Sequence, residues 1–161
     1  MSDTRPALFR RALFKITHPF VRLFWRLFKP RTIGVKALVI HDDAILLVKN
    51  INIDQWSLPG GGVNRKEIAE EALLRELDEE LAVANPEIAF KLGEYDSERE
   101  GKRDTVHLFV VKTSSREYRK QWELDDARWF FLGDLPGQLS PASRRRIIEF
   151  QAGKKNVVSG W

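Results

Sequence analysis

The stretch LPGGGVNRKEIAEEALLRELDEEL, residues 58–81, joins three consecutive glycines to a segment crowded with glutamates. This segment has helical periodicity, because Leu74, Leu77 and Leu81 recur at offsets 0, 3 and 7, and Leu73 widens the same stripe. We therefore expect a helix that packs these leucines into the core of the protein.

A second face of the expected helix carries Glu76, Glu79 and Glu80 at offsets 0, 3 and 4. Like charges at this spacing repel each other, at a cost of about 0.2 to 0.5 kcal/mol for each pair on an isolated helix. One interpretation is a solvated acidic face, which is common on surface helices. The other is a divalent cation, because Mg²⁺ takes oxygen ligands from a few carboxylates and keeps positions open for water and substrate phosphate.

Composition indicates one globular domain preceded by a basic arm. The chain has 161 residues, 43% of them hydrophobic and 31% charged, which suits a single core. Residues 1–41 hold nine Lys or Arg and one acid, a net charge of +8, whereas residues 42–161 carry a net charge of −4. Because cysteine is absent, disulfides, thiolate metal sites and a cysteine nucleophile are excluded. A reducing compartment is allowed, and we expect a cytoplasmic protein.

The arm, residues 1–31, has the pattern of amphipathic helices. In HPFVRLFWRLFKP, residues 18–30, large apolar side chains recur on one helical face between two prolines. Residues 8–16 form a second such segment, and neither is a run of about twenty apolar residues that would span a membrane. Three interpretations stay open: packing on the domain or on a second subunit, binding of residues 7–31 to an anionic membrane surface, and a cleaved targeting peptide.

Strand patterns follow the arm. Two β-branched runs around the turn residues HDDA predict a hairpin over Arg31 to Asn50. Further strands are expected at residues 87–95, 106–113 and 127–132, with a charged loop at residues 96–104. A last helix should begin near Ser140 as its N-cap, with Pro141 at the first helical position. Its inward-facing residues are expected to be Ile147, Ile148 and Phe150. The expected fold is an α/β or α+β sandwich.

Residues 61–83 resemble the Nudix box, which is a glycine, five residues, a glutamate, seven residues, and then Arg-Glu-apolar-x-Glu-Glu-x-Gly-apolar. The matching residues are Gly61, Glu67, Arg75, Glu76, Leu77, Glu79, Glu80 and Val83. Ala82 is the one departure, because the family has glycine there. A glycine just past a helix end usually adopts a left-handed conformation, so alanine should cost about 1 kcal/mol or move the helix end by one residue.

The resemblance implies a fold and a chemistry. The fold would be the Nudix α/β/α sandwich with a mixed sheet over residues 32–161, preceded by the amphipathic arm. Family members typically hydrolyse a nucleoside diphosphate linked to another group with the help of Mg²⁺ or Mn²⁺. The implied metal ligands are Gly61, Glu76, Glu79 and Glu80. The implied catalytic residues are Glu67, Arg75, Glu79 and Glu80, with Glu67 paired to Arg75 and Glu79 or Glu80 as base, and the implied substrate-binding residues are Gly60, Gly61 and Gly62.

Several residues outside the box stay ambiguous. Trp56 either stacks on a base or packs in the core, and the run Arg144 to Arg146 either faces phosphates or forms a solvated turn. The three histidines show no paired metal spacing and are expected to be structural or exposed. Candidates for an additional acid in the charged loop are Glu98, Glu100 and Asp104.

The sequence is compatible with three classes of function. The first is a metal-dependent pyrophosphohydrolase, with a nucleotide sugar or ADP-ribose favoured as substrate and a nucleoside triphosphate next. The second is a non-catalytic nucleotide-binding regulator on the same scaffold. The third is an adaptor that uses the basic arm to bind a membrane or, with less support, RNA. The resemblance and the apolar arm also predict a homodimer.

Overall fold

The computed structural model describes residues 31–51, 53–99 and 102–161. The predicted arm therefore lies outside the described residues, apart from its last position, Arg31. The elements are β1 (Arg31–His41), β2 (Ala44–Asn50), β3 (Trp56–Ser57), α2 (Ala69–Leu81), β4 (Glu87–Arg99), β5 (Lys102–Lys112), β6 (Leu124–Phe131), α3 (Pro141–Gln151) and β7 (Val157–Gly160). In this part of the chain, no helix is long and apolar enough to cross a membrane.

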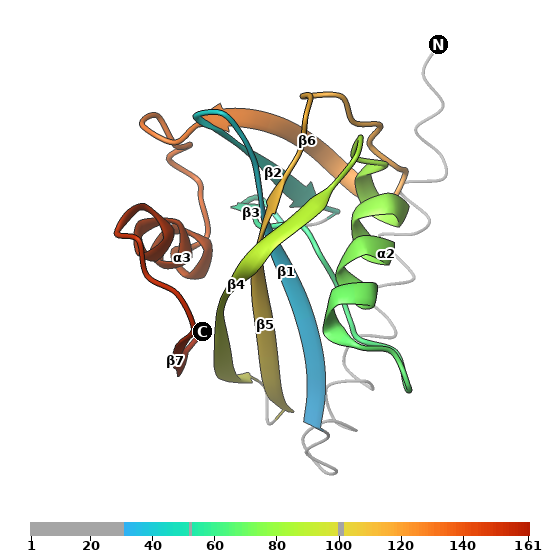
Figure 1. The fold of residues 1–161 in the computed structure, drawn as a ribbon, viewed down its shortest axis with the longest axis vertical. Helices are drawn as coiled ribbons and strands as arrows, with labels where there is room; N and C mark the ends of the chain where they lie inside the picture. The colour runs from blue at the N-terminus through green and yellow to red at the C-terminus, as the bar shows by residue number, and fades with distance from the viewer. Residues whose placement is uncertain (1–30, 52, 100–101) are drawn as a thin grey trace.

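The strands form one mixed sheet in the order β3-β2-β1-β5-β4-β7, with β6 paired to β2. The predicted hairpin is confirmed, because β1 and β2 pair antiparallel around the turn. β1 also pairs with β5 in parallel, which places the two central strands side by side. Helix α2 covers one face of the sheet and α3 covers the other, as expected for an α/β/α sandwich (Figure 1).

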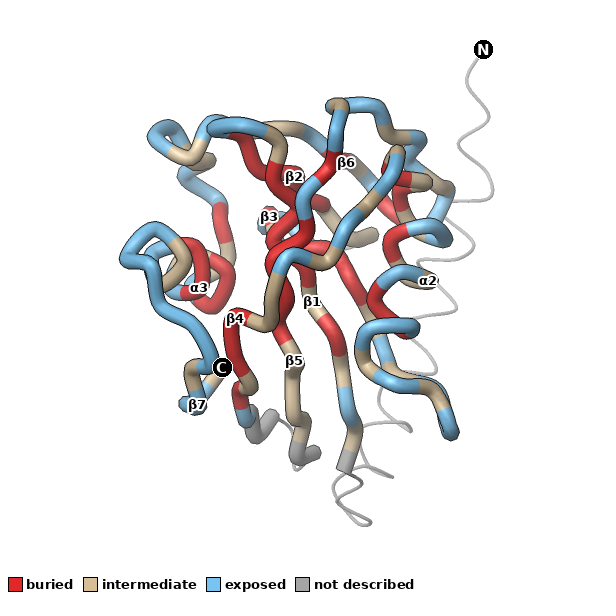
Figure 2. Tube along the Cα trace, viewed as in Figure 1, coloured by how far each residue is buried: buried red, intermediate tan, exposed pale blue. Residues whose placement is uncertain are grey.

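From Val35 to Ile40, both faces of β1 contribute side chains to the core, and alternate residues pack in its two halves. Val35, Ala37 and Val39 pack with the leucines of α2, whereas Leu38 and Ile40 pack on the side of α3. Successive side chains of a strand point to opposite faces, so a strand between two helices must be apolar on both. Figure 2 shows this buried band along the central strands.

Two apolar side chains do not face inward as predicted. Leu74 is 39% exposed, because the buried stripe of α2 runs through Ala72, Leu73, Leu77 and Leu81. In α3, Ile148 is 56% exposed and its neighbour Ile147 is fully buried. Adjacent helical positions are separated by about 100°, so the residue beside the centre of a narrow stripe turns away from the core.

The predicted charged loop at residues 96–104 is wrong. β4 continues to Arg99 and β5 begins at Lys102, so the two strands pair almost to their tips. The side chains of Asp96 and Thr105, which face each other across this ladder, are joined by a hydrogen bond of 2.9 Å. Polar residues can occupy a strand whose ladder is completed by backbone hydrogen bonds, and composition alone does not reveal this.

Helix α2 ends where the sequence predicted, and Ala82 itself adopts the left-handed conformation. Its φ is 40° and its ψ is 52°, and its N–H donates to the carbonyl of Asp78 at 3.0 Å. The helix end has not moved by a residue, so of the two expected outcomes the structure shows the strained alanine. The backbone turn that glycine normally makes is therefore preserved without glycine.

The C-terminal residues are held against β4 by a buried arginine. Arg146 of α3 is 3% exposed, and its guanidinium lies 4.0 Å from the ring centre of Tyr95. It also donates to the carbonyl of Gly160 at 3.0 Å and lies 3.1 Å from the carboxylate of Glu149. The hydroxyl of Tyr95 donates to the same carboxylate at 2.9 Å, and β7 pairs in parallel with β4.

Candidate active site

The glycine loop, residues 58–62, runs beside β1. The N–H of Val35 donates to the carbonyl of Gly61 at 2.9 Å, and the N–H of Ala37 donates to the carbonyl of Pro59 at 3.0 Å. Gly60 has a φ of 121°, and an added Cβ there would collide with the carbonyl oxygen of Val35. A side chain is therefore excluded at Gly60 by both conformation and space.

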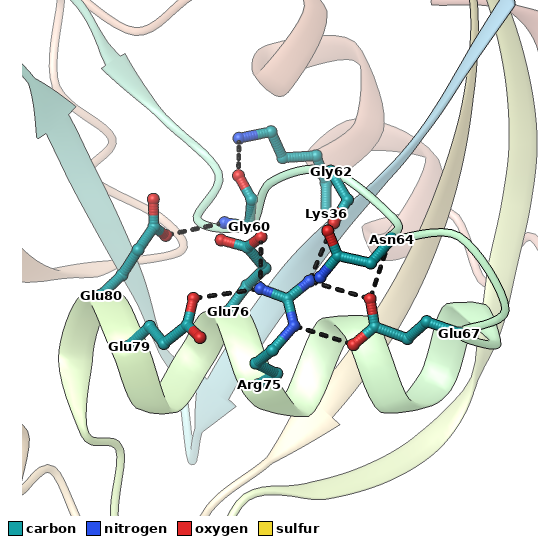
Figure 3. A network of polar contacts seen from close by, with 9 residues as sticks. All are labelled: Lys36, Gly60, Gly62, Asn64, Glu67, Arg75, Glu76, Glu79 and Glu80. Atoms are coloured by element: carbon teal, nitrogen blue, oxygen red, sulfur yellow. Dashed lines mark hydrogen bonds and ion pairs between the residues drawn. The ribbon is translucent and has the colours of Figure 1, made fainter.

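The acidic cluster, Glu76, Glu79 and Glu80 of α2, faces this loop (Figure 3). The carboxylate of Glu76 lies directly against Gly61, where an added Cβ would overlap it. The carboxylate of Glu80 accepts a hydrogen bond from the N–H of Gly60 at 2.9 Å. Helical spacing places these two glutamates one turn apart on the same side of α2, and the leucines on the buried face fix that side toward the loop.

Arg75 connects the acidic cluster to the start of the box. Its Nε donates to Glu67 at 2.8 Å, which shows the predicted contact between these two residues. Its Nη1 donates to Glu76 at 2.9 Å and to Glu79 at 3.0 Å, and its Nη2 donates to the carbonyl of Gly62 at 3.0 Å. One planar guanidinium thus fixes three carboxylates and the glycine loop relative to one another.

The hydrogen bonds of Arg75 shift its own pKa and that of Glu67. The pKa of Glu67 is lowered to about 2, chiefly because Arg75 donates to its carboxylate and also because the N–H of Asn64 does so. The pKa of Arg75 is raised, first by its bond to Glu67 and then by its bond to Glu76. Both groups are therefore charged at neutral pH, as a lasting ion pair requires.

Glu80 has a different environment from the other acids. Burial raises its pKa, the positive charge of Lys36 and the N–H of Gly60 oppose that rise, and the charges of Glu76 and Glu123 add to it. Glu123 precedes β6, and no sequence motif links it to the cluster, but the N–H of Gln121 donates to the backbone carbonyl of Glu80 at 2.9 Å and brings this segment to the end of α2. A residue distant in sequence can be assigned to the cluster only when the fold shows where its loop returns.

The donor set of the acidic cluster fits a hard divalent cation. Three carboxylates on adjacent turns of α2 offer only oxygen atoms, which are the ligands that Mg²⁺ and Mn²⁺ take. Among the described residues, no three acidic or histidine side chains converge closely enough to hold a metal as they stand. The reason is visible in the contacts: Arg75 engages Glu76 and Glu79, and Gly60 engages Glu80.

The carbonyls of the glycine loop point in different directions. The carbonyl of Gly61, which the resemblance implies as a metal ligand, is directed at β1 and bonded to Val35. The carbonyl of Gly60 accepts a hydrogen bond from the ammonium of Lys36 at 2.6 Å. Metal ligation by Gly61 and substrate binding by Gly60, Gly61 and Gly62 stay predictions.

A cavity of about 710 Å³ opens beside the loop and Glu67. Its walls combine apolar side chains of the sheet with polar and basic residues of the box. They are Thr32, Ile33, Gly34, Gly61, Gly62, Val63, Asn64, Arg65, Lys66, Glu67, Asp104 and Val106. This volume is within the range of small-molecule sites. Asp104, one of the acids considered as an addition to the site, lines this cavity and accepts a hydrogen bond from the hydroxyl of Thr32.

The remaining candidates lie elsewhere or are structural. Trp56 is 7% exposed and packs edge-on against Phe130, so it belongs to the core. The Arg144 to Arg146 run is not a solvated turn, because Arg146 is buried, and Arg144 donates to the carbonyl of Pro136 at 3.1 Å. His41 contacts the carbonyl of Thr113 and His107 contacts Glu94, so both have structural partners. His18, Glu98 and Glu100 lie outside the residues whose side chains are described.

Comparison with known proteins agrees with this geometry. The family model described as the NUDIX domain matches residues 30–150. The chain is 34% identical over 128 residues to a putative 8-oxo-dGTP diphosphatase of Bacillus subtilis, covering 78% of this chain and 84% of that protein. It is 30% identical over 117 residues to an ADP-ribose pyrophosphatase of Methanocaldococcus jannaschii, covering 70% of this chain and 69% of that protein.

Solved structures show the same fold. The crystal structure of a MutT NUDIX hydrolase from Burkholderia pseudomallei superposes with a TM-score of 0.64 at 28% sequence identity, covering 74% of this chain and 98% of that one. The matched region includes the glycine loop and α2, which carry the box residues. The protein therefore belongs to the Nudix hydrolase family.

Proposed function

We propose that this protein is a divalent-metal-dependent pyrophosphohydrolase that cleaves the pyrophosphate bond of a nucleoside diphosphate linked to another group. It is an enzyme that acts on phosphorus anhydrides, as its family membership shows. The observation that carries the finer proposal is the acidic cluster facing the glycine loop, with Arg75 holding two of its three carboxylates. Mg²⁺ is the expected cation and Mn²⁺ the expected substitute.

The residues of the site suit this reaction. A cation bound by Glu76, Glu79 and Glu80 would neutralise the pyrophosphate and lower the pKa of an attacking water. Arg75 holds Glu67, Glu76 and Glu79 beside the glycine loop, and Glu76 and Glu79 would exchange their contacts with Arg75 for the cation when it binds. Glu79 or Glu80 would accept the proton of that water, and the cleaved anhydride would leave as two phosphate-bearing products.

For the substrate, we favour a nucleotide sugar or ADP-ribose and place a nucleoside triphosphate second. The cavity beside Glu67 has room for a nucleoside with its phosphates, and it has polar, apolar and basic walls. One relative is named ADP-ribose pyrophosphatase, which supports the first class. Another is named putative 8-oxo-dGTP diphosphatase, which supports the second.

The other predicted functions have less support. A non-catalytic regulator would not need its full set of acidic side chains, and here Glu67, Glu76, Glu79 and Glu80 are all in place. Binding to a membrane or RNA through the arm, a homodimer, and a cytoplasmic location stay predictions from the sequence.

The decisive experiment is a panel of nucleotide sugars, ADP-ribose, nucleoside triphosphates and capped RNA, assayed with Mg²⁺ and with Mn²⁺ and with products separated by chromatography. Glu80→Gln should lose nearly all activity, because the variant lacks one negative ligand and one candidate base. Glu71→Gln is the matched control, since Glu71 lies on the exposed first turn of the same helix. Turnover by the Glu80 variant equal to that of the control would refute the proposal.

A further inference from the structure

The backbone of Gly60 is hydrogen-bonded to two side chains of opposite charge. Its N–H donates to the carboxylate of Glu80 at 2.9 Å, and its carbonyl accepts from the ammonium of Lys36 at 2.6 Å. Glu80 belongs to the last turn of α2 and Lys36 to β1, so hydrogen bonds from the helix and from the sheet meet at this one loop residue. Figure 3 shows Lys36 above the loop, opposite the acidic cluster.

Lys36 is an unusual residue for its position. It lies on the same face of β1 as Leu38 and Ile40, which are buried in the apolar core beside α3. The side chain of Lys36 is partly buried, and a buried ammonium is costly unless it is paired. An apolar side chain would fill the same place, so the charge itself needs an explanation.

The charges around the acidic cluster explain why a lysine is found at position 36. Arg75 contacts Glu67, Glu76 and Glu79 but has no contact with Glu80 among its hydrogen bonds and ion pairs. The positive charge that acts on Glu80 is that of Lys36, which also acts on Glu76. Burial lowers the pKa of Lys36, and the negative charges of Glu80 and Glu76 oppose that change. Through Gly60, which contacts both Lys36 and Glu80, the ammonium is held close to the carboxylates that would bind a metal cation.

We propose that Lys36 is a positioning residue that balances the charge of Glu80 and holds the Gly60 carbonyl, and that its ammonium weakens the binding of free divalent metal to the acidic cluster. Two cations next to the same carboxylates repel each other. The negative phosphates of a substrate offset that repulsion. The site therefore takes up its metal more readily together with the substrate than alone.

This inference rests on the proposed function in one respect, because it requires that the acidic cluster binds a divalent cation. Its test is calorimetric titration of the full chain with Mn²⁺ in the absence of nucleotide. Lys36→Met removes the charge and the donor, and Lys36→Gln removes the charge but keeps a donor for the Gly60 carbonyl. Lys36→Arg keeps the charge and is the control.

We expect both neutral variants to bind Mn²⁺ about tenfold more tightly than the wild type, a change of about 1.4 kcal/mol. The arginine variant should stay within about twofold of the wild type. A role confined to holding the loop predicts the opposite sign, since a loosened loop would bind the metal less tightly. Unchanged or weaker binding in the glutamine variant, with its fold verified by circular dichroism, would overturn the proposal.

The Glu80→Gln variant distinguishes failure of the Lys36 inference from failure of the proposed function. If Glu80→Gln loses Mn²⁺ binding while the neutral Lys36 variants bind no more tightly than the wild type, only the Lys36 inference fails. If Glu80→Gln and the wild type bind Mn²⁺ equally and are equally active, the metal site and the proposed function both fail.

Discussion

Replacement of Ala82 by glycine should stabilise the protein without changing its activity. Ala82 has a φ of 40° and a ψ of 52°, a left-handed conformation that costs an L-residue with a Cβ roughly 1 to 2 kcal/mol. Glycine removes that strain but adds conformational entropy to the unfolded chain, which costs about 0.5 to 1 kcal/mol. The expected net gain in the free energy of unfolding is therefore about 1 kcal/mol or slightly less.

This gain corresponds to a rise in Tm of about 3 °C, taking an unfolding entropy of about 2.1 cal/mol/K per residue for this chain length. Thermal and urea unfolding measure it. Asn85→Gly is the matched control, because Asn85 also has a positive φ, of 47°, yet asparagine tolerates that region better than alanine does. A Tm for Ala82→Gly that is unchanged or lower, or a larger gain at Asn85, would refute the reasoning.

Three further predictions concern the site. Gly60→Ala should destabilise the protein by about 3 kcal/mol in urea unfolding, because its Cβ would meet the carbonyl of Val35, whereas Gly62→Ala, where a Cβ meets nothing, should be close to neutral. The pKa of Glu67 is about 2 in the folded protein, below its unfolded value of about 4.3, so its contact with Arg75 stabilises above that unfolded value and is lost as the pH falls toward about 2. Glu67→Gln should therefore flatten the dependence of Tm on pH in this window, and an unchanged slope would contradict the assignment. Glu123→Gln should lower the pKa of Glu80 and move the acid limb of the activity profile to lower pH, since the charge of Glu123 raises that pKa; a shift to higher pH would count against a place for Glu123 beside the cluster.

The sequence predicts best where a local rule decides the structure. The hairpin up to Asn50 follows from turn residues between two apolar runs, and it is present. The start of α3 follows from Ser140 and Pro141, and the hydroxyl of Ser140 accepts from the N–H of Ser143 at 3.2 Å. The contact between Glu67 and Arg75 follows from the spacing of the box. In each case the interacting residues are close together in sequence.

Prediction fails where the partners are distant in sequence. Lys36 contacts Gly60 across 24 positions, and nothing near Lys36 marks it as part of the site. The charge of Glu123 acts on Glu80 because the chain returns to the end of α2 before β6, where the N–H of Gln121 donates to the backbone carbonyl of Glu80 at 2.9 Å. Arg146 is buried by Tyr95 and Trp161, although its neighbours in sequence are arginines that suggested a solvated turn.

The buried arginine of α3 also bears on how the sheet avoids unwanted pairing. β7 covers the edge of β4 from Gly93 to Asp96, and the N–H of Trp161 donates to the carbonyl of Asp96 at 2.8 Å. An uncovered strand edge is a template for pairing with other chains. By donating to the carbonyl of Gly160, Arg146 holds β7 on β4, so the sheet ends there in a strand of only 4 residues. Very short edge strands are one of the features by which proteins limit pairing with other chains.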